Sequence, residues 1–131
     1  DFWVGEWDVS PSSAPGVAAG RSSVQRVSGG CALLENWTAR NGPVGKSLNA
    51  FNKATGQWQQ YWVGQGGGVV EFRESRWDGP TLVLRTVGGT PWQRLSFTPL
   101  DSMTVRQFGE TSSDSGKTWQ VGYDFRYRRR P

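Results

Sequence analysis

Glu35 is the acidic residue best placed to do chemistry in this sequence. Strand pairing would surround it with Trp37, Trp62 and several amide side chains. Burial among such groups disfavours a charged carboxylate and raises its pKa, which suits a general acid or base. Glu35 is therefore the candidate catalytic residue, and the plainer alternative is a buried, hydrogen-bonded glutamate without turnover.

Other residue types narrow the possible chemistry. The sequence contains no His, which removes the usual general base and the usual haem or zinc ligand together. Cys31 has no evident activating neighbour, so we expect it to pack. The carboxylates are dispersed, and the glycine-rich segment 64–68 joins two expected strands with no following helix. We therefore expect neither a metal nor a cofactor.

The segments that hold these residues read as strands. The chain of 131 residues has 18 Gly and 7 Pro at nearly regular intervals, and β-forming residues alternate with period two between them. Successive hairpins form an antiparallel meander, and closing it removes two exposed edges. We expect an all-β fold, a single antiparallel up-and-down β-barrel of about 8–10 strands, as one domain over residues 1–131. The expected strands lie near residues 2–9, 20–28, 31–39, 45–52, 57–63, 69–75, 81–87, 91–98, 103–110 and 117–128.

Hairpin pairing decides which side chains face the inside of this barrel. A loop over residues 53–56 sets Asn52 opposite Gln57, and extending the pairing gives one mostly apolar face and one charged face. The apolar face also carries Glu35, Asn49 and Gln60 in one cross-strand row. Unpaired polar groups in a dry core cost about 1–3 kcal/mol each, so a lumen holding water or ligand would satisfy them. A filled polar core and a wrong register are the alternatives.

The candidate ligand-binding residues are side chains expected on this inner face. The segment 103–110 leaves two parities open, with either Arg106 and Phe108 or Val105 and Gln107 inside. An inward Arg106 could pair with a carboxylate or hold an anionic ligand. The full set is Trp37, Ser47, Asn49, Trp58, Gln60, Trp62, Phe72, Glu74, Gln93, Arg106 and Tyr123.

These residues favour binding of a small, mostly apolar molecule in a partly polar lumen. A cofactor-free isomerase, cyclase or hydrolase using Glu35 is the alternative. The net charge of +4 is compatible with nucleic acid, but the aromatic residues are expected inside, whereas stacking platforms must be exposed. We expect no nucleic-acid partner, no membrane span, and a monomer or homodimer. The sequence leaves the compartment open between cytoplasmic and, if an N-terminal leader has been removed, periplasmic or secreted.

The segment from Ser112 to Trp119 matches the Asp-box pattern Ser-x-Asp-x-Gly-x-Thr-Trp of sialidase-type propeller blades. A propeller would repeat this pattern, and here it occurs once. We interpret it as a hairpin turn in which Asp114 accepts hydrogen bonds from backbone N–H groups and Trp119 anchors the base.

Gly5-x-Trp7 in the first expected strand resembles the first-strand signature of lipocalins and other calycins. That resemblance implies a calycin-type barrel in which Trp7 closes one end and a late arginine, Arg126 or Arg128, packs over it. A wider resemblance is to uncharacterised bacterial lipocalin-like proteins, which implies the same barrel and no defined activity. It is carried by residues 30–37, 45–49, 55–62, 105–107, the Asp-box-like hairpin and 127–129. Nitrobindin-like barrels look similar but hold haem through a His that this chain lacks.

Overall fold

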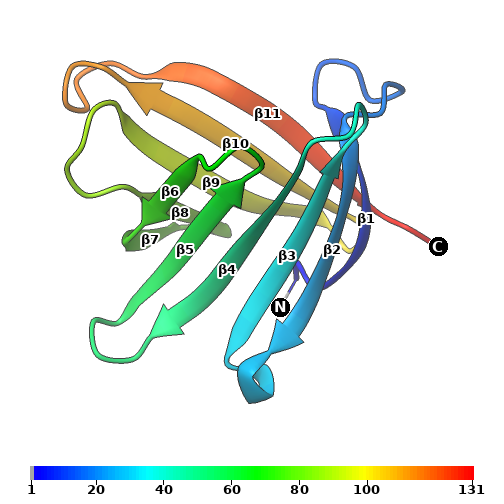
Figure 1. Ribbon diagram of the computed structural model, residues 1–131, viewed down its shortest axis with the longest axis horizontal. Coiled ribbons are helices and arrows are strands. Elements are labelled where there is room, and N and C mark those ends of the chain that lie inside the picture. Colours follow the sequence, from blue (N-terminus) through cyan, green and yellow to red (C-terminus); the bar gives the residue numbers. More distant parts are fainter. Residues whose placement is uncertain (1) are drawn as a thin grey trace.

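The computed structural model describes residues 2–131, and these form a nearly closed antiparallel β-barrel (Figure 1). In this view β2 to β5 make the nearer wall, and β9 to β11 cross behind them. The predicted all-β barrel is confirmed. The strands are β1 (Gly5–Pro11), β2 (Gly20–Val27), β3 (Ala32–Ala39), β4 (Val44–Asn52), β5 (Gln57–Gly64), β6 (Val69–Phe72), β7 (Glu74–Asp78), β8 (Thr81–Arg85), β9 (Trp92–Asp101), β10 (Thr104–Ser112) and β11 (Gln120–Arg129). A short 3-10 turn, η1 (Ser28–Gly30), joins β2 to β3.

Eleven strands replace the expected eight to ten because one predicted strand is bent into two. The sheet order is β6-β5-β4-β3-β2-β1-β11-β10-β9-β8-β7, so all neighbours except β1 and β11 follow one another in the chain. β6 pairs with β5 and β7 pairs with β8, although only Arg73 separates β6 from β7. The chain itself therefore links the two ends of the sheet.

Side chains complete the boundary between β5 and β7, which we call the seam. The Trp58 N–H donates to Ser75 Oγ at 2.8 Å, and the Ser75 N–H donates to Gln57 Oε1 at 2.6 Å. Gln59 Nε2 adds a bond of 3.2 Å to the Arg73 carbonyl oxygen. Backbone groups at the seam thus find partners without a regular ladder.

The strand pairing preserves most of the expected inner face. Asn52 lies opposite Gln57 and Asn49 opposite Gln60, as predicted. Between β3 and β4 the register differs from the prediction by two residues, so Glu35 lies opposite Ser47. A shift of two keeps every side chain on its expected face, because side chains alternate with period two.

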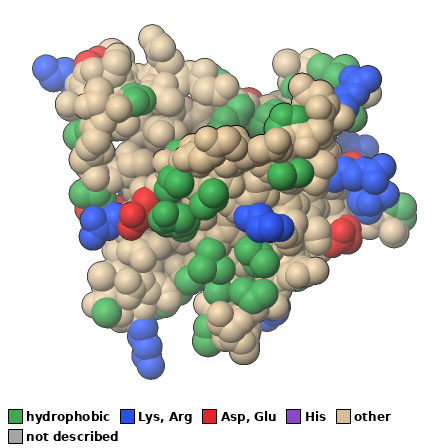
Figure 2. Space-filling view, viewed as in Figure 1, with side chains coloured by type: hydrophobic (Ala, Val, Ile, Leu, Met, Phe, Trp, Pro, Cys, Tyr) green, Lys and Arg blue, Asp and Glu red, His purple; other side chains and the backbone are tan. Residues whose placement is uncertain are grey.

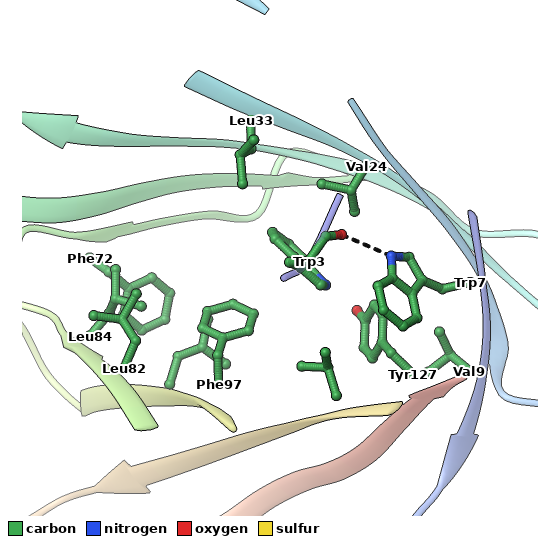
Figure 3. Packing of buried hydrophobic residues seen from close by; sticks show 12 residues of the cluster. Trp3, Trp7, Val9, Val24, Leu33, Phe72, Leu82, Leu84, Phe97 and Tyr127 are labelled. Carbon is green, nitrogen blue, oxygen red and sulfur yellow. Dashed lines mark hydrogen bonds between the residues drawn. The ribbon is translucent and has the colours of Figure 1, made fainter. Parts of the chain in front are cut away.

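Three buried residues around Trp3 show how one end of the barrel is filled. The expected first strand begins only at Gly5, and residues 2–4 pack against the core instead. Figure 3 shows Trp3 between the two walls, with Leu33 on one side and Phe97 on the other. The Trp3 and Phe97 ring centroids are 4.9 Å apart, and Trp7 Nε1 donates to the Trp3 carbonyl oxygen at 2.9 Å.

The cation over Trp7 is Arg129, and not Arg126 or Arg128. Its guanidinium carbon lies 4.3 Å from the Trp7 ring centroid. Arg129 also donates to the carbonyl oxygens of Val4 and Phe2 at 2.6 and 3.0 Å. The predicted positions were wrong because side chains alternate along β11. Arg129 shares its face with the buried Tyr127, whereas Arg126 and Arg128 lie on the opposite face.

The outer face of the barrel is less polar than the pairing predicts. Leu48, Tyr61, Val63 and Val69 are exposed on β4, β5 and β6. Figure 2 shows hydrophobic side chains gathered in the middle of this face. Isolated exposed apolar residues are common, so the notable feature is that these lie on neighbouring strands.

The Asp-box segment forms the expected hairpin turn between β10 and β11. Asp114 accepts hydrogen bonds from Ser112 Oγ, Thr118 Oγ1 and the Thr118 N–H, which lower the pKa of its carboxyl to about 2. Trp119 and Val121 lie outside, because a register shift between Gly109 and Glu110 reverses the alternation of β11.

Candidate functional site

A cavity of about 320 Å³ lies inside the barrel. Its lining comes from β3, β5, β6, β9, β10 and β11, so both walls contribute. This volume falls within the range of small-molecule sites, which combine apolar surface with a few convergent polar groups. The lining residues are Glu35, Trp37, Gln60, Trp62, Val70, Phe72, Gln93, Gln107, Tyr123, Phe125 and Tyr127.

Glu35 is the buried acid of this cavity, with 2% of its surface exposed. Its Oε2 accepts hydrogen bonds from Ser22 Oγ at 2.8 Å and from Tyr127 Oη at 2.9 Å. Its Oε1 accepts one from Ser47 Oγ at 3.0 Å. Three strands, β2, β4 and β11, therefore fix the orientation of this carboxyl.

A chain of amide and hydroxyl groups extends from Glu35 across the wall. Gln60 Nε2 donates to Asn49 Oδ1 at 2.7 Å, and Asn49 Nδ2 donates to Ser47 Oγ at 2.9 Å. Ser47 in turn donates to Glu35. This network satisfies the inner polar row predicted from the sequence and holds Gln60 at the cavity surface.

Burial controls the ionisation of the groups at the base of the cavity. Desolvation raises the pKa of Glu35 above its ordinary value, against the lowering effect of its three hydroxyl partners. Desolvation and the nearby Glu35 charge also raise the pKa of Tyr123 and Tyr127. Both tyrosines are therefore neutral hydrogen-bonding groups at physiological pH.

Glycines on the neighbouring strand make room for two tryptophan rings of the lining. A Cβ added to Gly45 would lie 2.4 Å from the Trp62 ring, and one added to Gly20 would lie 2.8 Å from the Trp37 ring. The rings therefore lie against backbone, where any other residue would push them away. This packing keeps bulky side chains at the wall and the lumen open.

Tyr123 is accommodated in the same way on β11. A Cβ added to Gly109, directly opposite it on β10, would lie 2.3 Å from its ring. Tyr123 also stacks on Phe125, with ring centroids 5.1 Å apart. We refer to Trp37, Trp62 and Tyr123 as the aromatic ring set.

A second, smaller cavity of about 130 Å³ lies at the end of the barrel that Trp3 fills. Trp58 and Asn49 line it together with Leu33 and Leu84. Ser47 is buried behind Glu35. The structure thus separates the predicted residues into two cavities, and it brings Glu35, Trp37, Gln60, Trp62, Phe72, Gln93 and Tyr123 together in the larger one.

Glu74 and Arg106 lie outside, which corrects two predicted site residues. The bend at Arg73 interrupts the alternation, so Glu74 pairs with Arg85 on the outer face, with 2.5 Å between Oε2 and Nη2. Arg106 forms a bidentate pair with Asp124 at 2.9 and 2.7 Å. β10 therefore points Val105 and Gln107 into the barrel, where both are buried, rather than Arg106 and Phe108.

The prediction missed four lining residues, which are Val70, Gln107, Phe125 and Tyr127. Gln107 lines the cavity because its face of β10 points inward, and the alternation of residues in that segment could not decide which face does so. Phe125 and Tyr127 follow Tyr123 at intervals of two residues, so the alternation that predicted Tyr123 could have identified them as well. Tyr127 is the most informative omission, because it contacts Glu35 across 92 positions of sequence.

A larger hollow of about 570 Å³ lies on the outside, against the β1–β2 loop. It is lined by residues 15–18 and by charged residues such as Asp8 and Arg21, whose side chains are 60% and 70% exposed. Solvent-exposed ion pairs of this kind contribute little. The cavity inside the barrel, where aromatic rings and amides surround the buried Glu35, is therefore the stronger candidate site.

Comparison with known proteins finds no family model and no curated protein that matches this chain. Within residues 2–131, no group of three or more acidic, Cys or His residues could hold a metal ion. No helix in that part of the chain is long and apolar enough to span a membrane. The geometry described above is therefore the basis for assigning a function.

Proposed function

We propose that the protein binds a small, largely apolar molecule in the cavity around Glu35. The observation that carries this proposal is the composition of the lining, in which six aromatic rings share one cavity with three glutamines and one carboxyl. The rings supply apolar contact area, and the few polar groups would fix the orientation of the ligand. A purely structural core would be drier and more completely filled.

A barrel of the calycin type would suit this role. Trp7 under the Arg129 guanidinium resembles the arrangement implied by the Gly5-x-Trp7 signature. Arg129 also holds the N-terminal segment that closes one end of the barrel, through the Val4 and Phe2 carbonyls. One closed end and an internal cavity are the properties that such a binding barrel needs.

A cofactor-free catalytic role for Glu35 is the second candidate, favoured by its buried position and raised pKa. A protonated carboxyl beside a bound molecule can act as a general acid. In that case Glu35→Gln would abolish turnover of a substrate while the cavity still binds it. Retained turnover in this variant would exclude the catalytic role.

Neighbouring residues of β6 provide a direct test of binding in the cavity. Val70 lines the cavity, whereas Val69 is 50% exposed on the outer face. We expect Val70→Trp to weaken binding of 2-phenylethanol or 2-naphthylethanol at least about tenfold by filling the lumen, and Val69→Trp to leave it unchanged. Ligand-observed NMR titration measures both affinities. Absence of saturable binding by the unmodified protein, or equal binding by the two variants, would contradict the proposal.

A further inference from the structure

The described lining of the cavity contains a carboxyl group but no cationic side chain to pair with it. Glu35 is its one carboxyl, and the described lining residues include no Lys or Arg. The other polar groups of the lining side chains are the amides of Gln60, Gln93 and Gln107, two tyrosine hydroxyls and two tryptophan indole N–H groups. Burying a carboxylate without a cation beside it costs free energy. A positively charged ligand would supply the missing partner.

The hydrogen bonds around Glu35 suit its ionised form. Ser47 Oγ accepts a bond from Asn49, so its own proton is directed to Glu35 Oε1. Ser22 and Tyr127 both donate to Oε2. A carboxylate has about four acceptor positions, so Oε1, with one donor, retains capacity for another. An ammonium N–H is a donor of the required kind.

The aromatic ring set adds a second feature that favours a cation. Trp37, Trp62 and Tyr123 lie against glycine backbone, which brings three π-systems to the wall of one cavity. The face of an aromatic ring attracts an alkylammonium group, most strongly for Trp and where water is excluded. The rings and the carboxylate therefore favour the same charge.

Other ligand charges fit this lining less well. An anion would be placed against the Glu35 carboxylate with no basic side chain among the described lining residues to offset the repulsion. A neutral molecule would fill the space but would leave the carboxylate unpaired. The net charge of +4 does not alter this balance, because none of the described residues that line the cavity is cationic.

We propose that the ligand is a small organic amine, bound as its ammonium ion by the Glu35 carboxylate and the surrounding aromatic rings. This inference rests on the proposed binding function and names the class of ligand. The amine carries an apolar body of aromatic or aliphatic character, which fills the remainder of a cavity about twice the volume that holds benzene.

Three probes of the same shape test the inference. We expect 2-phenylethylamine to bind at least about tenfold more tightly than 2-phenylethanol, and phenylacetate to bind most weakly, by calorimetric titration near pH 8. Equal affinity for the amine and the alcohol would overturn the amine proposal and leave the binding function intact. No binding of any of the three would overturn both, and tightest binding of phenylacetate would overturn the amine proposal alone.

Substitutions locate the preference in the cavity. Glu35→Gln should remove the preference for the amine over the alcohol, whereas Glu71→Gln, an equal charge change on the exposed face of β6, should preserve it. Trp62→Leu should reduce amine affinity more than alcohol affinity, because a leucine has no π face. If Glu71→Gln and Glu35→Gln have the same effect, the preference does not come from the cavity and the inference fails.

The unmodified protein provides a further test. The titratable groups near Glu35 are Tyr123 and Tyr127, which stay neutral, while Ser22 and Ser47 do not titrate in this range. Amine affinity should therefore rise with pH as Glu35 ionises, since an alkylammonium ion stays charged to about pH 9. Affinity for the alcohol should not rise in parallel. A parallel rise for both probes would contradict the proposed ion pair.

Discussion

At Glu35, a single carboxyl opposes the apolar character of its surroundings. Its three hydroxyl partners come from three strands, and each favours the charge that burial disfavours. Burial prevails, so the folded protein holds the Glu35 proton to a higher pH than the unfolded chain, whose glutamate has the ordinary pKa of 4.5. Ionisation of this residue is thus linked to stability.

The ligand-free protein should lose stability relative to Glu35→Gln as the pH rises above 4.5. The unfolded chain releases the Glu35 proton first, so the unfolding free energy falls by up to about 1.4 kcal/mol per pH unit until the folded carboxyl ionises as well. Urea denaturation of both proteins across this pH range measures the difference. A pH-independent difference between them would show that Glu35 titrates alike in both states.

Among the strands, the bend at Arg73 has the largest structural effect. It divides one segment between two partners, directs Glu74 outward and leaves side chains to complete the seam. The Ser75 hydroxyl is central here, because it accepts the hydrogen bond of the Trp58 amide.

Removing the Ser75 hydroxyl should loosen the seam before the rest of the barrel. Ser75→Ala leaves the Trp58 N–H without its partner, so we expect a loss of about 1 kcal/mol and faster amide exchange at Trp58. Hydrogen–deuterium exchange read by NMR tests this, with Ser96→Ala on β9 as the control. Unchanged protection at Trp58 would mean that the hydroxyl does not hold the seam.

Alternation predicted the strands and most of the inner face, because pairing errors of two residues preserve the face, as at Glu35 opposite Ser47. It failed where one residue breaks the period, at Arg73 and at the register shift after Gly109. It also left Arg106 undecided, since both faces of that segment carry one polar and one apolar side chain. Contacts such as Tyr127 with Glu35 depend on barrel closure and have no local signal.

For the molecule as a whole, the closed end of the barrel depends on contacts between the two chain ends. Arg129, near the C-terminal end, binds the carbonyls of Phe2 and Val4 near the N-terminal end and covers Trp7. Trp3 can then fill the centre against Phe97. The last strand thus holds residues 2–4 at this end of the barrel.

Arg129→Met should therefore destabilise the whole barrel. It removes charge-assisted hydrogen bonds and the contact with Trp7, so we expect a loss of about 2 kcal/mol in unfolding free energy. Arg128→Met, on the exposed face of the same strand, should change it by less than about 0.5 kcal/mol. Chemical denaturation compares the two variants, and similar losses would argue against the closing role of Arg129.

The seam also bears on the proposed binding of a ligand inside the barrel. Ten boundaries between strands are set by main-chain pairing, whereas the contact between β5 and β7 depends on Gln57, Gln59 and Ser75. A change of rotamer in these side chains can widen the circumference there without disturbing any ladder. Substitutions at the seam, rather than in the lining, offer a simple way to adapt the barrel to wider ligands.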